Sequence, residues 1–108
     1  AGIKGIGSSL AYASSKGALN TMTKSMARNL GPIRVNAICP GFIQGDWLKQ
    51  GMGDDLYNAA KESLTSTTPL KLTVTPEQVA EGIYNFIEIS TVVTGETMLM
   101  DGGHHLIV

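Results

Sequence analysis

Only two short segments of this sequence have the composition of a β-strand, which leaves few folds open to it. Residues 33–38 are rich in β-branched and apolar side chains between turn residues, and residues 97–100 form a second short apolar run. Three other segments, residues 8–30, 54–64 and 76–89, carry apolar residues at helical spacing. Two strands do not make an independent sheet, and three helices over them bury little apolar surface. We therefore expect that the isolated chain is not a stable monomer.

The helix predicted over residues 8–30 has clear end signals. Ser8 and Ser9 can cap its start, and Gly31 as a left-handed cap followed by Pro32 ends it. One face carries an apolar stripe, which we interpret as core or as a helix-pair interface rather than a ligand-binding surface. The stripe consists of Leu19, Met22, Met26 and Leu30.

The other two predicted helices differ in their flanking residues. The helix at 54–64 lies between flexible segments, 51–53 and 66–69, an arrangement typical of a lid over a substrate. The helix that runs to about Ile89 begins at a capping box, because Thr75 is followed by Pro76 and, three positions on, by Gln78.

Tyr12 is followed four residues later by Lys16, within the first predicted helix. At this spacing the two side chains share one helix face. A lysine ammonium favours the phenolate and lowers the pKa of a neighbouring tyrosine, which makes the pair a candidate proton donor and acceptor. Two such common residues also meet at this spacing by chance, so on its own the pair is better explained as an exposed tyrosine and lysine on a helix surface.

Three further motifs follow in order: residues 33–41 (IRVNAICPG), 93–95 (VTG) and 100–103 (MDGG). Together with Tyr12 and Lys16, they resemble the C-terminal half of the short-chain dehydrogenase/reductase family, and most nearly its 3-oxoacyl-carrier-protein reductase-like members. The resemblance covers essentially the whole chain. It implies an α/β fold, the C-terminal portion of a Rossmann-like, doubly wound parallel sheet.

The resemblance also implies an activity and the residues that carry it. We expect an NAD- or NADP-dependent oxidoreductase that transfers hydride reversibly between the nicotinamide and a secondary alcohol or ketone. Tyr12 is then the general acid/base, and Lys16 binds the ribose and tunes Tyr12. Ligands of open α/β sheets bind beyond the carboxyl ends of strands. The cofactor is therefore expected at Tyr12, Lys16, Pro40, Gly41, Phe42 and Ile43.

Several parts of the family pattern are missing. The glycine-rich phosphate loop, the catalytic serine and the catalytic asparagine do not occur in these 108 residues. We expect residues 1–108 to be the C-terminal part of one NAD(P)-binding domain whose N-terminal half is absent, and to be inactive alone. The alternative is a truncated, non-catalytic chain that only associates with partners. A third interpretation is an unrelated small α/β binding domain with Tyr12 and Lys16 on its surface.

Two local features depart from the pattern or imitate it. A threonine that family members often have after the Pro-Gly turn is replaced by Gly45, with Gln44 beside it, which puts the cofactor clamp in doubt. Residues 2–7 (GIKGIG) imitate a phosphate loop. No strand precedes them and no acidic residue follows until Asp46, so we interpret them as a flexible turn.

The segment that covers the substrate in the family supplies candidate pocket residues whose types suggest an apolar or mixed substrate, although each is equally consistent with packing. They are Trp47, Met52, Leu56 and Tyr57. The pair His104-His105 has only Asp101 nearby as a further ligand type, so a plain tail is favoured over a metal site.

The net charge of −1 provides no basic surface for nucleic acid or for a membrane. The single cysteine, Cys39, excludes an internal disulfide and suits a reducing compartment, and no apolar run is long enough to span a bilayer. We expect a cytoplasmic protein with a small-molecule alcohol or ketone substrate. By resemblance it forms a dimer or tetramer, partly through the stripe on the tyrosine helix. The choice between NAD and NADP and the identity of the substrate stay open.

Overall fold

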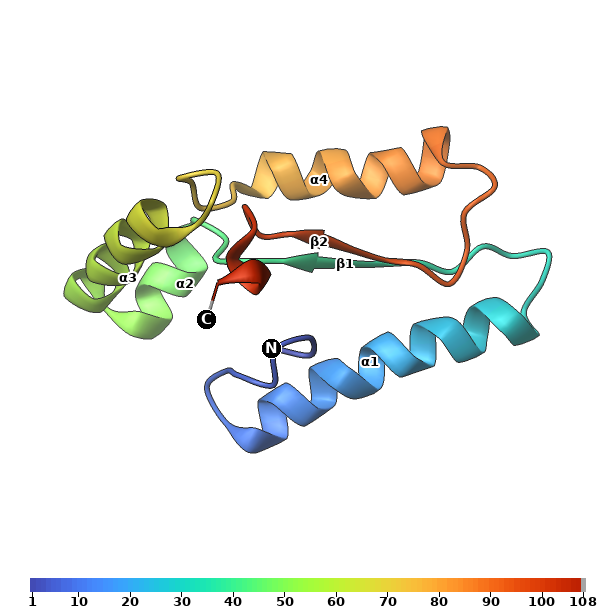
Figure 1. The fold of residues 1–108 in the computed structure, drawn as a ribbon, viewed down its shortest axis with the longest axis horizontal. Coiled ribbons are helices and arrows are strands. Elements are labelled where there is room, and N and C mark those ends of the chain that lie inside the picture. Colours follow the sequence, from blue (N-terminus) through green and yellow to red (C-terminus); the bar gives the residue numbers. More distant parts are fainter. Residues whose placement is uncertain (108) are drawn as a thin grey trace. The chain divides into compact units, whose positions relative to one another are not determined.

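The computed structural model describes residues 1–107 (Figure 1). They form two compact units: unit 1 comprises residues 1–37 and 86–98, and unit 2 comprises residues 38–85 and the segment from Leu99 onward. Two strands, β1 (Ala37–Pro40) and β2 (Thr97–Met100), pair with each other. They are parallel, because the Ala37 N–H bonds the Glu96 carbonyl and, further along both strands, the Gly41 N–H bonds the Met100 carbonyl.

Unit 1 contains α1 (Leu10–Asn29), the first predicted helix. Ser9 caps it as expected, since its hydroxyl accepts the Tyr12 N–H at 3.1 Å. The expected left-handed cap at Gly31 is wrong. The helix ends at Leu30, with a φ of −105° and its N–H bonded to the Met26 carbonyl.

The strand predicted at residues 33–38 begins later than expected, because ahead of Ala37 most of the cross-links come from side chains, beside one backbone bond from the Gly95 N–H to the Val35 carbonyl at 2.7 Å. The Val35 N–H donates to the Thr94 hydroxyl at 3.0 Å. Asn36 uses its amide group twice, donating to the Val93 carbonyl and accepting the Glu96 N–H. Ile33 is left 64% exposed. Only residues from Ala37 on make the backbone pairing that defines β1.

Arg34 links the two segments of unit 1, residues 1–37 and 86–98, by hydrogen bonds. Its guanidinium donates to the carbonyls of Phe86, Ile87 and Ser90. These carbonyls belong to, or directly follow, the one-turn π-helix η1 (Asn85–Ile89). One planar cation thus binds three carbonyl groups at and just after the end of this helix, of which the Ser90 carbonyl also accepts the Val93 N–H at 3.1 Å.

Unit 2 contains three α-helices. The sequence predicts one helix at 54–64, but the structure has two, α2 (Asp46–Met52) and α3 (Asp54–Thr67). Gly51 and Met52 lie inside α2, so the only residue between the two helices is Gly53, which has a φ of 82°. The third helix, α4 (Pro76–Tyr84), begins at the predicted capping box formed by Thr75 and Gln78.

The end of the predicted third helix is also confirmed, because η1 continues α4 to Ile89. Within unit 2, α4 lies beside the parts of β1 and β2 that belong to this unit, residues 38–40 and 99–100 (Figure 1). Gly82 makes this close approach possible, since a Cβ added to it would collide with the Met100 sulfur and lie 3.5 Å from Ile38 Cδ1.

Few apolar side chains are buried. Among the described residues they are Tyr57, Val74 and Phe86. The α1 stripe is not a core face of this chain, since Leu19, Met22, Met26 and Leu30 are between 38% and 50% exposed. Within residues 1–107, none of the helices is long and apolar enough to cross a bilayer.

Candidate functional site

Tyr12 and Lys16 lie side by side at the start of α1, as their spacing predicts. The Lys16 ammonium lies 5.4 Å from the centroid of the Tyr12 ring, which is within cation–π distance. Tyr12 is 45% exposed, so its phenol is accessible from outside the chain. The ammonium and the accessible phenol ring therefore lie together on one face of α1.

Two glycines of the N-terminal segment allow the chain to pass close to this pair. A Cβ on Gly7 would lie 2.9 Å from the Tyr12 ring carbon Cδ1, and a Cβ on Gly2 would lie 2.6 Å from the Lys16 carbonyl carbon. The segment turns back on itself through a hydrogen bond from the Gly5 N–H to the Ala1 carbonyl. The turn predicted for residues 2–7 is confirmed, and the glycines serve contact with α1.

The loop after β1, residues 41–45, contains the predicted cofactor residues Gly41, Phe42 and Ile43. Ile43 forms an isolated parallel bridge with Val74. Its hydrogen bonds run from the Gln44 N–H to the Val74 carbonyl and from the Val74 N–H to the Phe42 carbonyl. In such a bridge the N–H and C=O of Ile43 itself point to the opposite side. The loop thus directs one backbone donor and one backbone acceptor away from Val74.

The Gln44 side chain is engaged within the protein. Its amide nitrogen donates to the Thr73 hydroxyl at 2.9 Å and to the Thr73 carbonyl at 3.2 Å. Both amide protons of Gln44 therefore have partners. Of the polar groups in the Gln44 side chain, only the amide oxygen is left for other partners, so the NH₂ group does not replace the hydroxyl of the missing threonine.

Gly45 stands where family members often have threonine, and its backbone conformation explains why this position is a glycine. Its φ is 153°, in a region that side chains with a Cβ rarely adopt. The Gly45 N–H donates to the Tyr57 hydroxyl at 3.1 Å. The Tyr57 ring in turn lies 5.3 Å from the Phe42 ring, centroid to centroid.

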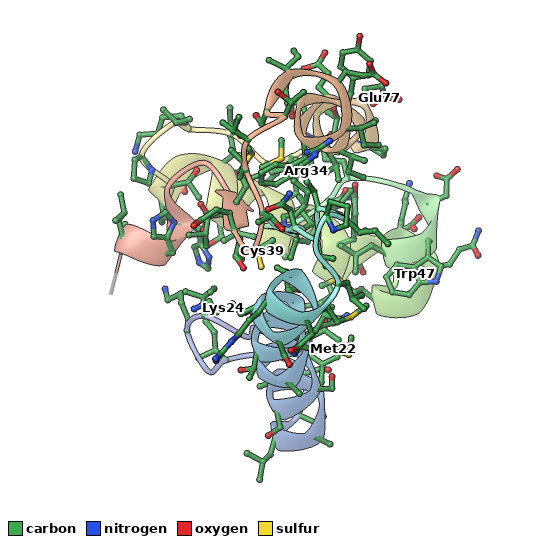
Figure 2. All side chains as sticks on the ribbon, turned by 90° about the vertical axis from the view of Figure 1, so that its right-hand side faces the viewer. Met22, Lys24, Arg34, Cys39, Trp47 and Glu77 are labelled. Carbon is green, nitrogen blue, oxygen red and sulfur yellow. The ribbon has the colours of Figure 1, made fainter. Side chains whose placement is uncertain are left out.

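The four predicted substrate residues have different surroundings. Tyr57 is buried, Met52 is half-buried, and Leu56 and Trp47 are 59% and 86% exposed. Figure 2 shows the Trp47 side chain projecting from α2. A buried Tyr57 is placed to support the loop of residues 41–45, whereas Trp47 and Leu56 present apolar surface.

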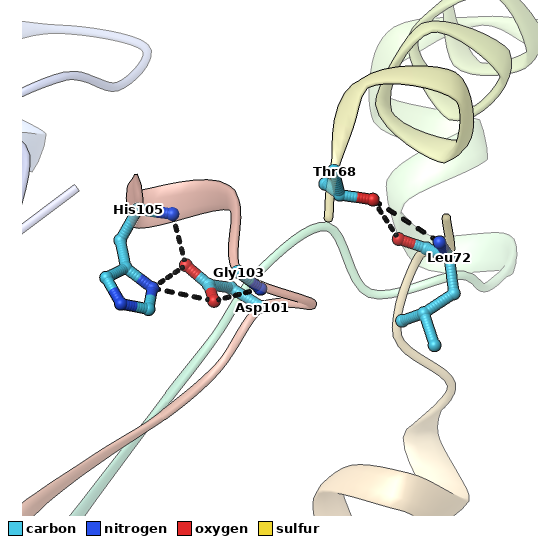
Figure 3. Close-up of polar contacts among 5 residues, drawn as sticks. All are labelled: Thr68, Leu72, Asp101, Gly103 and His105. Carbon is cyan, nitrogen blue, oxygen red and sulfur yellow. Dashed lines mark hydrogen bonds and ion pairs between the residues drawn. The ribbon is translucent and has the colours of Figure 1, made fainter. Parts of the chain in front are cut away.

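The C-terminal residues form an ordered turn instead of the plain tail expected. The Asp101 carboxylate accepts the Gly103 and His105 N–H groups and lies 2.9 Å from His105 Nδ1 (Figure 3). The short helix η2 (His104–Leu106) follows. Among residues 1–107 there is no group of three His, Cys, Asp or Glu side chains that could hold a metal ion.

Sequence reasoning missed Thr73 and the role of Tyr57. Thr73 is followed by Val74 in a segment without helical or strand pattern, and both are buried. Their pairing partners lie about thirty residues away in sequence, and no local signal indicates a bridge of this kind.

The comparison with known families decides the identity of the fold. A family model described as enoyl-(acyl carrier protein) reductase matches residues 1–105. The chain belongs to the short-chain dehydrogenase/reductase family. Its α/β structure is part of the Rossmann-like fold of that family.

Three relatives illustrate the similarity. The short-chain dehydrogenase/reductase homolog YusR of Bacillus subtilis is 36% identical, over 98% of this chain and 78% of YusR. The dihydromonapterin reductase of Citrobacter koseri is 38% identical, over 90% of this chain and 38% of that enzyme. A crystal structure of a small-chain dehydrogenase in complex with NADPH has a TM-score of 0.87 and 29% identity, covering 98% of this chain and 48% of that one. The chain spans 33–42% of the length of five curated relatives, one of which is this dihydromonapterin reductase.

Proposed function

We propose that this chain is the C-terminal, catalytic part of an NAD- or NADP-dependent oxidoreductase that interconverts a secondary alcohol and a ketone. The observation that carries the proposal is the pairing of Tyr12 with Lys16, whose ammonium lies 5.4 Å from the exposed phenol ring. Membership in a family of dehydrogenases and reductases and the NADPH-bound structural relative support it.

Each proposed residue has a defined task. Tyr12 gives its phenolic proton to the carbonyl oxygen during reduction and takes it back during oxidation. Lys16 stabilises the phenolate form of Tyr12 and bonds the hydroxyls of the cofactor ribose. The chemistry that a bound nicotinamide supplies is hydride transfer.

The loop of residues 41–45 is proposed to hold the nicotinamide carboxamide. The N–H and C=O of Ile43 supply one donor and one acceptor, while the neighbouring groups of Phe42 and Gln44 are occupied by Val74. Trp47, Met52 and Leu56, on the two helices that follow, are proposed to line the substrate pocket. Their side chains favour an apolar or mixed substrate.

The proposal requires a dinucleotide-binding half that these residues do not include. We propose that the native protein supplies it, and the first experiment is an intact-mass measurement on that protein. A mass near 11.4 kDa identifies the chain as a separate polypeptide, whereas about twice that mass or more shows that the other half is covalently present. A nicotinamide-absorbance assay on the native protein follows. Turnover with ketones or secondary alcohols supports the proposal, and absence of NAD(P)H binding overturns it.

A second candidate function is a non-catalytic association module. The exposed α1 stripe favours it, because Leu19, Met22 and Met26 are each at least 38% exposed and suit a helix–helix interface. Such a module self-associates but has no affinity for a nicotinamide cofactor. Sedimentation of the native protein with and without NAD(P)H therefore distinguishes the two candidates.

A further inference from the structure

The loop of residues 41–45 is held on two sides by side chains that sequence comparison alone does not single out. On one side, Gln44 donates to the Thr73 hydroxyl and carbonyl at 2.9 and 3.2 Å. On the other, the Tyr57 hydroxyl accepts the Gly45 N–H at 3.1 Å. Thr73 is only 6% exposed and Tyr57 only 7%, so both anchors are fixed by the packing around them.

These contacts join three segments of unit 2. Gly45 is the residue from which α2 starts, and it has no side chain with which to cap that helix. Tyr57 comes from α3, and its ring lies beside Phe42 in the loop. Thr73 lies in the segment that leads into α4 and is followed by Val74, the bridge partner of Ile43. The positions of α2, α3 and the loop are therefore coupled through Tyr57.

The direction of the Ile43 N–H and C=O, which point away from Val74, depends on these contacts. The Ile43 N–H shares a peptide unit with the Phe42 carbonyl, and the Ile43 carbonyl shares one with the Gln44 N–H. Neither unit can rotate unless its hydrogen bond to Val74 breaks. Gln44 and Tyr57 add three side-chain hydrogen bonds that oppose such a rotation. Position 45 contributes no side chain to this restraint. It is a glycine with a φ of 153°, which a threonine would rarely adopt.

We propose that Tyr57 and Gln44 are positioning residues that keep the Ile43 N–H and C=O directed at a nicotinamide carboxamide. The inference rests on the proposed function. Neither side chain needs to touch the cofactor. They act through the backbone of the loop, and Tyr57 also ties the helical segment proposed to cover the substrate to the same loop.

Two conservative variants of the native enzyme test this proposal. Tyr57→Phe keeps the ring on Phe42 and removes only the acceptor for the Gly45 N–H. Thr73→Val keeps the shape of a buried side chain and removes the hydroxyl acceptor for Gln44. Tyr84→Phe is the matched control, because Tyr84 is 59% exposed at the end of α4. The dissociation constants of NAD(P)H and of the corresponding ADP-ribose, which lacks the nicotinamide, are measured for each protein by fluorescence titration or calorimetry.

We expect each variant to weaken NAD(P)H binding by about threefold to tenfold, the effect of one neutral hydrogen bond, with ADP-ribose binding unchanged. Hydrogen exchange at the Gly45 amide is faster in Tyr57→Phe and unchanged in Tyr84→Phe. Equal losses for both ligands indicate a general structural role and overturn the inference, as do unchanged affinities for both. If the native enzyme turns over substrate but the variants lose no more affinity for NAD(P)H than for ADP-ribose, only this inference is overturned and the proposed function stands. A native enzyme that binds no NAD(P)H overturns both.

Discussion

The Asp101 carboxylate lies 2.9 Å from His105 Nδ1 and also accepts the His105 backbone N–H at 2.8 Å. A third bond comes from the Gly103 N–H at 3.0 Å. Burial by itself raises the pKa of the Asp101 carboxyl, but the hydrogen bonds from His105 and Gly103 outweigh it and lower that pKa below 3.8. The ionised carboxylate thus organises the turn between β2 and η2.

This relationship predicts an acid-dependent loss of stability. A carboxyl with a lowered folded-state pKa binds protons more readily when the chain is unfolded. Its contribution is therefore complete above about pH 4, near the unfolded-state pKa, and is lost as the pH falls through the lower folded-state pKa. We expect Asp101→Asn to reduce the free energy of unfolding of the native protein by about 1–3 kcal/mol at pH 7. The difference should shrink below pH 4.

Chemical unfolding of both proteins between pH 7 and pH 2.5 measures this difference. Glu81→Gln, which changes an exposed carboxylate of α4, is the control. A deficit for Asp101→Asn that is constant over the whole pH range would show that the charge on Asp101 does not matter.

Tyr12→Phe removes the phenolic proton while leaving the ring and the helix in place. We expect turnover of the native enzyme to fall by about 10²–10⁴, the usual contribution of general acid–base catalysis. NAD(P)H binding should change little, because the ring can still lie beside Lys16. Steady-state kinetics and a cofactor titration make the measurement, with Tyr84→Phe as the control. Near-normal turnover in Tyr12→Phe would exclude Tyr12 as the acid.

Gly45→Thr restores the residue that family members often have, and we expect it to be harmful here. The φ of 153° is rarely adopted by residues with a Cβ, so the variant stores strain of about 1–3 kcal/mol or shifts the loop. Thermal unfolding with NAD(P)H titration measures both effects. The matched control, Gly51→Ala, lies inside α2 with no atom within 4 Å of the added Cβ. It should stabilise the protein by about 0.5–1 kcal/mol.

Arg34→Met leaves the carbonyls of Phe86, Ile87 and Ser90 without the guanidinium. We expect a loss of about 2–3 kcal/mol in the free energy of unfolding, because hydrogen bonds to a charged donor are worth more than neutral ones. Arg34→Lys should recover less than half of this loss, since one ammonium does not reproduce the planar fork. Denaturant unfolding gives the values. Full recovery by lysine would mean that charge alone matters.

Local signals predicted most of the helices and the last strand. Ser9 caps α1, the Thr75–Gln78 capping box starts α4, and β2 occupies the predicted residues 97–100. The two caps depend on side chains that act on their own backbone within one turn, so a short window of sequence contains the cause, whereas β2 is recognised by its apolar composition. The placement of Lys16 beside Tyr12 is of the same kind, because helix geometry brings residues four apart together.

The sequence by itself therefore determined α1, α3, α4 and β2, the Tyr12–Lys16 pair and the family resemblance, but not the helix α2. Only the tertiary structure decided where β1 begins, that Gly53 alone separates α2 from α3, and that Gln44 and Tyr57 hold the loop of residues 41–45. The physical reason is the sequence separation of the interacting residues. Asn36 bonds Val93 and Gln44 bonds Thr73, partners far apart in sequence, and such hydrogen bonds exist only after the chain has brought those segments together.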